Sequence, residues 1–354
     1  MHMADALLSP AVGGAMWAAS SGTIAYCSSK VRKELDDRKV PLMGVLGAFL
    51  FAAQMINFSI PGTGSSGHLG GGLLLAILLG PHAAFLAIAS VLVVQALFFA
   101  DGGLLALGCN VFNLGFFPAL VAYPFVYRKI AGERPGHARV TVAAVVAAVA
   151  GLQMGALAVV LQTVASGISS LPFPAFVALM QPIHLAIGIV EGLATAAIVS
   201  FVRKARPDIL QATVEAPKGG RHPFRNVLLA FLAAAFLAGG ILSWFASGNP
   251  DGLEWSIAKA TGKTGIAWRE PGIHRTLAAL QERFAFLPDY SFRKSPERRS
   301  ESAGAGPGRQ VSDARNREEG GRIGTTVSGV IGGLISLALV FLAGFLLKKR
   351  SRDA

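Results

Sequence analysis

Charged side chains are scarce in this chain. Asp, Glu, Lys and Arg together make up 15% of the 354 residues, whereas hydrophobic residues make up 53% and the mean hydropathy is +0.53. A soluble domain carries about 25% charged residues, so the composition excludes an ordinary soluble protein and indicates an all-α, polytopic integral membrane protein. We predict spans of about 20 residues, or fewer where a segment is buried in protein. They are residues 10–28, 41–59, 69–80, 83–100, 109–127, 139–165, 182–202, 226–246 and 327–347.

Basic residues are absent from every second short connection between these spans. The connections without Lys or Arg are 1–9, 60–68, 101–108 and 166–181. The connections rich in them are 29–40, 128–139, 203–225 and the tail after 347. Lys and Arg are enriched in cytoplasmic loops, whereas long segments such as 247–326 escape this rule. The net charge of +12 therefore indicates topology and not a nucleic-acid partner. It predicts a multi-pass protein of a bacterial-type inner membrane, with the amino terminus outside and the carboxyl terminus in the cytoplasm.

Catalytic and redox signatures are missing as well. The two cysteines, Cys27 and Cys109, lie in apolar surroundings without CxxC spacing, so we expect inert packing residues. Gly262-Lys-Thr264 resembles the end of a phosphate-binding loop, but Ile257 stands where the upstream glycine is required. HExxH and GxSxG motifs are absent. Residues 1–9 also lack the basic start of a cleavable signal peptide. We expect neither an enzyme nor an ATP-hydrolysing motor in this chain, and no bound cofactor.

The chain divides into two units. Residues 1–205 form a compact unit of seven predicted spans with short connections, and 206–225 have the composition of a cytoplasmic linker. Residues 226–354 form a second unit, in which two spans flank the external segment 247–326. Residues 293–322 are dense in charge, Gly and Ser, so we expect them to be disordered.

Metal-binding chemistry is offered by the first two residues, Met1-His2. A free amino terminus before a histidine supplies the terminal amine, the backbone nitrogen of His2 and an imidazole nitrogen. Together these close a five- and a six-membered chelate ring. Nitrogen-rich, planar coordination suits Ni(II) or Cu(II), and imidazole is also acceptable to Co and Zn. His2 could equally be a terminal residue without a role, since such short motifs often occur by chance.

A second imidazole would complete a four-nitrogen plane, and His68 is the candidate. It lies in the glycine-rich stretch GTGSSGHLGGG (62–72), and the predicted topology puts this loop on the same outer face as the amino terminus. Glycine lets such a loop approach another segment closely. A plain turn between helices is the alternative interpretation.

Polar residues within the spans are costly to bury in lipid, so we expect each of them to have a structural or functional role. We expect Asn110 to hold a loop or the ring of His68 from outside the coordination sphere. His184 lies near the outer end of its span and could act in the same way. Glu191, two helical turns deeper, is expected to be a packing or gating partner. For Gln153 we prefer hydrogen bonding between helices.

With these residues identified, residues 1–205 resemble the CbiM/NikM family, the substrate-binding membrane component of energy-coupling factor (ECF) transporters for cobalt and nickel. The resemblance rests on four stretches in the same order, MHMADALLSP (1–10), GSSGHLGGG (64–72), DGGLLALGCN (101–110) and HLAIGIVEG (184–192). Residues 226–347 resemble the small accessory component of the PDGLE or CbiN type, fused onto the same chain. NPDGLE (249–254) and LPDY (287–290) carry that second resemblance.

The resemblance implies a function and partners. It implies import of Ni²⁺ or Co²⁺ for metalloenzymes or cobalamin synthesis, with the metal held by Met1, His2 and His68. It also implies a transmembrane coupling protein and cytoplasmic ATPase subunits, which this chain does not encode. A four-nitrogen plane favours nickel on geometry, but the sequence leaves both metals open.

Two other functions remain open at this point. A stand-alone channel or secondary transporter is one, although the spans lack the chain of acidic residues typical of ion-coupled carriers. An intramembrane metalloenzyme built from His68, His184 and Glu191 is the other. It would need an open coordination position that holds water.

Overall fold

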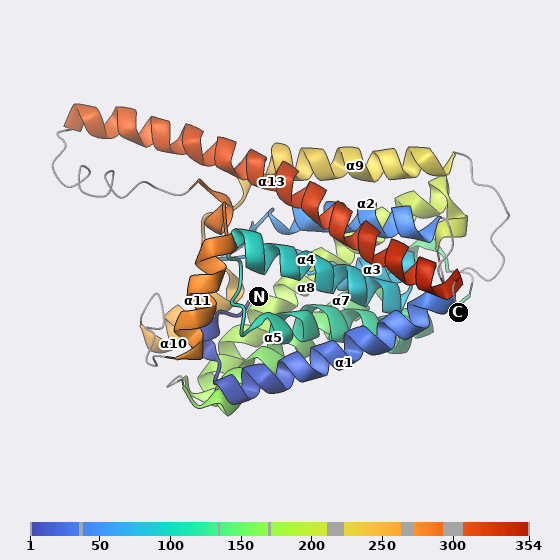
Figure 1. The fold of residues 1–354 in the computed structure, drawn as a ribbon, viewed down its shortest axis with the longest axis horizontal. Helices are drawn as coiled ribbons and strands as arrows, with labels where there is room; N and C mark the ends of the chain where they lie inside the picture. Colours follow the sequence, from blue (N-terminus) through green and yellow to red (C-terminus); the bar gives the residue numbers. More distant parts are fainter. Residues whose placement is uncertain are drawn as a thin grey trace.

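The computed structural model describes residues 2–34, 38–133, 135–168, 171–210, 223–262, 272–292 and 307–352. Over these ranges the chain is mostly helical, which confirms the predicted fold class. Most of the long helices lie side by side along the long axis of the molecule, while α10 and α11 lie across the end where the amino terminus is found (Figure 1). That end carries the candidate site.

The first unit contains α-helices, short 3₁₀ or π segments and one small sheet. They are η1 (Asp5–Leu7), α1 (Pro10–Glu34), α2 (Lys39–Gln54), β1 (Phe58–Ile60), β2 (Ser65–Gly67), α3 (Gly72–Leu79), α4 (Pro81–Phe99), α5 (Leu107–Val111), η2 (Phe112–Tyr127), α6 (Arg128–Ala131), α7 (His137–Ser166), α8 (Phe173–Ala205) and η3 (Pro207–Ile209). The rest of the described chain contains α9 (Phe224–Gly240), η4 (Leu242–Phe245), α10 (Gly252–Thr261), α11 (Ile273–Phe284), η5 (Pro288–Tyr290) and α13 (Pro307–Arg352).

Among the described residues, five helices are long and apolar enough to cross a membrane. They are Pro81–Phe99, Leu107–Ala131, His137–Ser166, Phe173–Ala205 and Arg322–Arg350. Two shorter apolar helices, α2 and α9, lie where further spans are predicted. The 25-residue α1 covers the first predicted span. These apolar helices indicate a membrane protein.

Two predicted spans need correction. The segment 69–80 forms only the eight-residue α3, whose residues are all buried. Eight residues rise about 12 Å, so the helix itself covers only part of a hydrocarbon core of about 30 Å, and residues 69–71 complete the path from the His68 loop toward the start of α4. The predicted span 41–59 ends at Gln54, and Phe58–Ile60 enter the sheet instead. An apolar run alone does not tell a buried helix from a spanning one.

The predicted disorder of 293–322 is also wrong in part, because α13 begins at Pro307 and continues into the last apolar stretch. Residues 293–306 lie outside the described ranges. Further along, α13 packs on α2 through small residues. A side chain at Gly47 would meet Val340 at 2.8 Å, and one at Gly329 would meet the backbone of Gly239 on α9. Such small residues let membrane helices approach closely.

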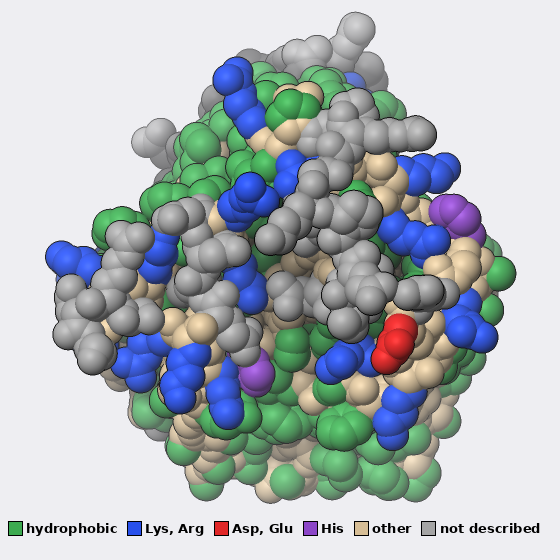
Figure 2. Space-filling view, turned by 90° about the vertical axis from the view of Figure 1, so that its right-hand side faces the viewer, with side chains coloured by type: hydrophobic (Ala, Val, Ile, Leu, Met, Phe, Trp, Pro, Cys, Tyr) green, Lys and Arg blue, Asp and Glu red, His purple; other side chains and the backbone are tan. Residues whose placement is uncertain are grey.

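Basic side chains gather at one end of the molecule. The last turns of α1, α6 and α8 carry Lys or Arg, and α13 ends in the basic tail. Figure 2 shows Lys and Arg spread over the end of the molecule that lies on the right in Figure 1, opposite α10 and α11. The connections rich in Lys and Arg thus lie together at one end of the folded molecule.

Candidate metal centre

The imidazole rings of His2 and His68 meet face to face. Their centroids lie 5.1 Å apart and their planes differ by 10°. The His2 side chain is 7% exposed, and burial lowers the pKa of its imidazole. Burial likewise lowers the pKa of His68 to about 3. Both rings therefore stay neutral near pH 7, which is the state that binds a metal.

A short hairpin delivers His68 to this position. Strands β1 and β2 pair antiparallel, Phe58 with Gly67 and Ile60 with Ser65. The turn between them uses Gly62 and Gly64 at positive φ, a conformation that glycine adopts without strain. His68 follows directly after β2, so the hairpin holds the loop against the bundle.

The backbone beyond His68 is held from within the bundle. Gly70 N donates to Glu191 Oε2 at 2.7 Å and Gly71 N to Oε1 at 3.0 Å. Gln54 Nε2 donates to the carbonyl of Gly70 at 3.0 Å. Both oxygens of the buried Glu191 carboxylate thus accept main-chain amides. Glu191 anchors the loop from α8, an arrangement that does not leave it as a ligand beside His68.

The segment that carries His2 is pinned by main-chain pairing. Met3 N donates to Asn110 Oδ1 at 2.8 Å and Asn110 Nδ2 to Met3 O at 3.2 Å, while Gly103 N donates to Met3 O at 2.9 Å. Asp5 accepts from Ala106 N at 2.9 Å. Asn110 therefore holds the amino-terminal segment and not the ring of His68. Met1 lies outside the described residues.

The other contact of His2 is with Asp101. Its Nδ1 lies 3.2 Å from Asp101 Oδ1, while its Nε2 is buried and has no hydrogen-bond partner. A carboxylate only accepts, so Nδ1 carries the proton in this arrangement. The predicted six-membered chelate ring uses Nδ1. It therefore requires the imidazole to change tautomer, with its proton on Nε2, and to turn Nδ1 away from Asp101 when metal binds.

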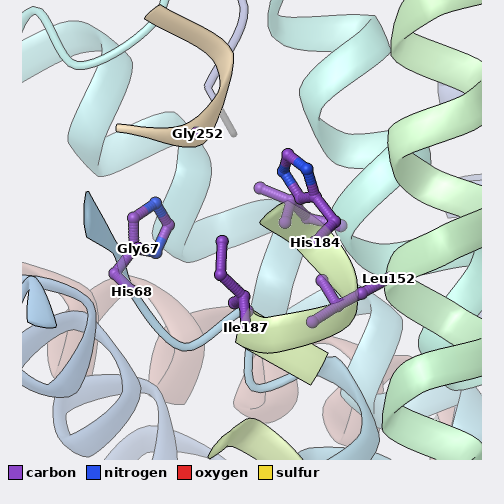
Figure 3. A pocket seen from close by; sticks show the side chains of 8 residues that line it. Gly67, His68, Leu152, His184, Ile187 and Gly252 are labelled. Carbon is purple, nitrogen blue, oxygen red and sulfur yellow. The ribbon is translucent and has the colours of Figure 1, made fainter. Parts of the chain in front are cut away.

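His184 faces the same region from α8. Its Nδ1 donates to the Met180 carbonyl at 2.8 Å, and its Nε2 is buried without a partner. A small cavity of about 10 Å³ lies between His68 and His184, with Gly252 also in its wall (Figure 3). That volume suits a single water-sized occupant.

The external segment covers the His68 loop, a contact that the sequence analysis did not foresee. Ser66 N donates to Pro250 O at 2.8 Å, and Ser66 Oγ donates to Asn249 O at 2.8 Å. Trp255 Nε1 donates to Thr63 O at 2.9 Å. The NPDGLE stretch was noted as a family mark, and its position against the loop is what gives it a structural purpose.

The same segment also covers the His2 side. His274 Nε2 donates to Leu8 O at 2.9 Å, although sequence reasoning gave His274 no role. Gln281 Nε2 donates to the carbonyl of Gly102 at 2.7 Å, and Tyr290 Oη donates to Asp101 Oδ2 at 2.5 Å. No local signal links Tyr290 to Asp101, which lies 189 residues away.

The chemistry of the site rests on nitrogen donors. Within the described ranges, no three His, Cys, Asp or Glu side chains cluster so as to hold a metal ion. The two stacked imidazoles can supply two nitrogens, so a complete coordination sphere needs main-chain or terminal nitrogens beside them. The geometry does not favour the metalloenzyme alternative, since Glu191 is engaged elsewhere.

Comparison with known proteins decides the family. The model of the cobalt uptake substrate-specific transmembrane region, CbiM, matches residues 2–209, and that of the PDGLE domain matches residues 225–349. The chain belongs to the CbiM family. This confirms the resemblance drawn from the four stretches of the first unit, together with that drawn for the accessory unit.

Its relatives are metal transport proteins. The chain is 31% identical to the fused nickel transport protein NikMN of Rhodobacter capsulatus over 82% of this chain and 88% of the relative. It is 33% identical to the cobalt transport protein CbiM of Sorangium cellulosum over 59% of this chain and 94% of the relative. A crystal structure of a truncated transition metal transporter is similar with a TM-score of 0.51 and 32% identity, covering 57% of this chain and 98% of that one. The chain thus belongs to a family of nickel and cobalt transport proteins.

Proposed function

We propose that this chain is the substrate-specific component of an ECF-type importer of Ni²⁺ or Co²⁺, and that it captures the metal through Met1, His2 and His68. The observation that carries the proposal is the stacking of two neutral imidazoles, one on the second residue and one on a glycine-rich loop. Imidazole and amide nitrogens suit Ni(II), and a four-nitrogen plane would favour it over Co(II) on geometry.

The direction of transport is part of the proposal. The basic end would face the cytoplasm, following the rule that cytoplasmic loops carry Lys and Arg. The metal site at the opposite end would then face outward, with the amino terminus. A transmembrane coupling protein and a pair of ATPases would act on the chain from the basic end.

Nickel binding to the purified full-length protein in detergent tests the site. We expect His2→Ala and His68→Ala each to lose high-affinity binding of Ni²⁺, because each removes a coordinating nitrogen. His137→Ala is the matched control, since its exposed ring lies at the start of α7, near the basic end. The control should bind as the unaltered protein does. Near-normal nickel content in either of the first two variants would reject this site.

Uptake in cells tests the proposed partners. If a coupling protein and ATPases drive import, cells that express this chain without them should accumulate no more ⁶³Ni than cells with an empty vector. Cells that also express the partners should accumulate nickel above both. Equal accumulation with and without the partners would support a stand-alone channel or carrier instead.

A further inference from the structure

One carboxylate joins the accessory segment to the proposed metal ligand His2. Tyr290 Oη donates to Asp101 Oδ2 at 2.5 Å, and the other oxygen of Asp101 lies 3.2 Å from His2 Nδ1. Asp101 belongs to the connection between α4 and α5, whereas Tyr290 ends η5 in the external segment. The contact therefore spans the two units of the chain and ends on the imidazole.

The backbone on both sides of this contact is held in an unusual conformation. Within the described ranges, the non-glycine residues with positive φ are Ala100 at 54°, Asp289 at 51° and Tyr290 at 58°. Ala100 directly precedes Asp101, so all three flank the Tyr290–Asp101 hydrogen bond. Left-handed backbone is uncommon outside glycine because it brings the side chain into steric conflict with the backbone. It persists where the surrounding structure holds it, often at functional sites.

The tyrosine ring is positioned by the first unit. It stacks on Phe99 of α4 with centroids 5.1 Å apart and planes 17° apart, and it meets the edge of Phe51 of α2 at 6.2 Å. Burial, followed by the charge of Asp101, raises the pKa of Tyr290 well above its ordinary value. The hydroxyl therefore keeps its proton and remains a donor to the carboxylate.

We infer that Asp101 and Tyr290 are positioning residues for His2, with the carboxylate accepting an imidazole N–H and the tyrosine hydroxyl holding the carboxylate in place. The inference rests on the proposed metal site. In the metal-free arrangement the Asp101 carboxylate accepts a hydrogen bond from His2 Nδ1–H. When metal binds, Nδ1 releases its proton to the solvent and Nε2 takes one up, so the ring changes tautomer without a net loss of protons. A half-turn about Cβ–Cγ then presents Nδ1 to the chelate and brings the new Nε2–H toward the Asp101 side. The same carboxylate thus supports the ring before and after the metal binds.

This arrangement gives the accessory unit a direct role in metal affinity. A carboxylate on the second nitrogen of a metal-binding histidine fixes the ring orientation and makes it a better ligand, and loss of such a partner weakens metal binding by roughly 10- to 100-fold. Tyr290 acts one step further out, through Asp101. We therefore expect its removal to have a smaller effect, and only while Asp101 is present.

A double-mutant cycle on the full-length protein tests this chain of contacts, with Ni²⁺ affinity as the readout. Tyr290→Phe removes only the hydroxyl and should weaken binding by about 10-fold, whereas Asp101→Ala should weaken it by roughly 10- to 100-fold. In the Asp101→Ala background, Tyr290→Phe should cause no further loss, because residues that act in series are non-additive. Tyr26→Phe, at an exposed tyrosine of α1, is the matched control and should leave affinity unchanged. If Asp101→Ala does not fold, Asp101→Asn takes its place in the cycle.

The outcomes separate this inference from the proposed site. Unchanged affinity in Tyr290→Phe would overturn the inference, and so would an equal loss in both backgrounds, which would mark a merely structural role. If His2→Ala abolishes binding while Tyr290→Phe does not affect it, the metal site stands and only the positioning role fails. If His2→Ala binds nickel normally, the metal site itself has failed.

Discussion

The two histidines of the site are held by different parts of the molecule. His68 is anchored within the first unit, by a hairpin and by a loop whose amides bind the buried Glu191. His2 lies on an end segment, and one of its contacts, Asp101, is shared with the accessory unit. The accessory unit thus touches the backbone beside His68, which the bundle also anchors, whereas at His2 it bonds the carboxylate that contacts the imidazole itself. This difference gives a physical reason to fuse the two units in one chain.

The imidazoles of His2 and His68 are anchored differently, but burial lowers the pKa of both. The largest effect we predict follows from this shared property. Metal then displaces no proton from either imidazole near pH 7. The terminal amine, with an ordinary pKa near 8, and the His2 amide still lose one each. Nickel affinity should fall by about 100-fold per pH unit just below pH 7, measured by competition titration, with no added steepness in the ordinary imidazole range near 6.5. A slope that steepens below about pH 6.5 would show that the imidazoles titrate normally.

Removing the anchor of His68 should have the next largest effect. Glu191→Ala leaves the amides of Gly70 and Gly71 buried without acceptors, at a cost of about 1–3 kcal/mol each. We expect a clear drop in the melting temperature of the metal-free protein and more than about 100-fold weaker nickel binding. Glu191→Gln, which keeps one acceptor oxygen, should be intermediate on both measures. Normal affinity in Glu191→Ala would mean that the loop does not need this anchor.

Loosening the His2 segment should cost less stability but still impair binding. Asn110→Ala removes two hydrogen bonds to the backbone of Met3, so nickel affinity should fall by roughly 10- to 100-fold. The melting temperature should fall less than in Glu191→Ala, because the segment lies at the end of the chain. Isothermal titration and thermal unfolding of the same sample check both statements. A larger loss of stability than in Glu191→Ala would reverse the comparison.

The smallest effect is expected where the accessory unit touches the better-anchored ring. Trp255→Phe removes one hydrogen bond to Thr63 O, worth about 1 kcal/mol, so affinity should fall only a few-fold. Trp244→Phe is matched to it, since that indole donates to Thr326 away from the site. We expect no change of nickel affinity in the control. A loss in Trp255→Phe as large as that in Asn110→Ala would place His68 under the control of the accessory unit.

Much of this arrangement can be predicted from the sequence, and the exceptions have physical causes. Hydropathy and the alternation of basic residues identify most helices and the polarity of the molecule. The helix α3 is shorter than the predicted span 69–80, because an apolar run does not show where a buried helix begins. Residues 307–322 were taken as disordered from their charge, yet Arg, Glu, Gln and Ala are good helix formers and continue α13.

Some residues of the candidate site can likewise be predicted from the sequence, and others cannot. His2 and His68 can be predicted because each lies in a short local sequence motif that indicates metal binding. The contacts of Tyr290 with Asp101 and of Pro250 with Ser66 join residues more than 180 positions apart. No periodicity or spacing encodes such contacts, so only the folded chain reveals them.

The central claim is that the chain end itself, together with His2 and His68, binds the metal. Nickel content after dialysis, measured on protein with one glycine added before Met1, tests it most directly. The extension converts the terminal amine to an amide and separates His2 from the chain end, so the fused chelate rings cannot form. A tag at the carboxyl terminus is the control. We predict one nickel per chain in the control and loss of high-affinity nickel in the extended protein, with both proteins equally folded. Full nickel content in the extended protein would contradict the account.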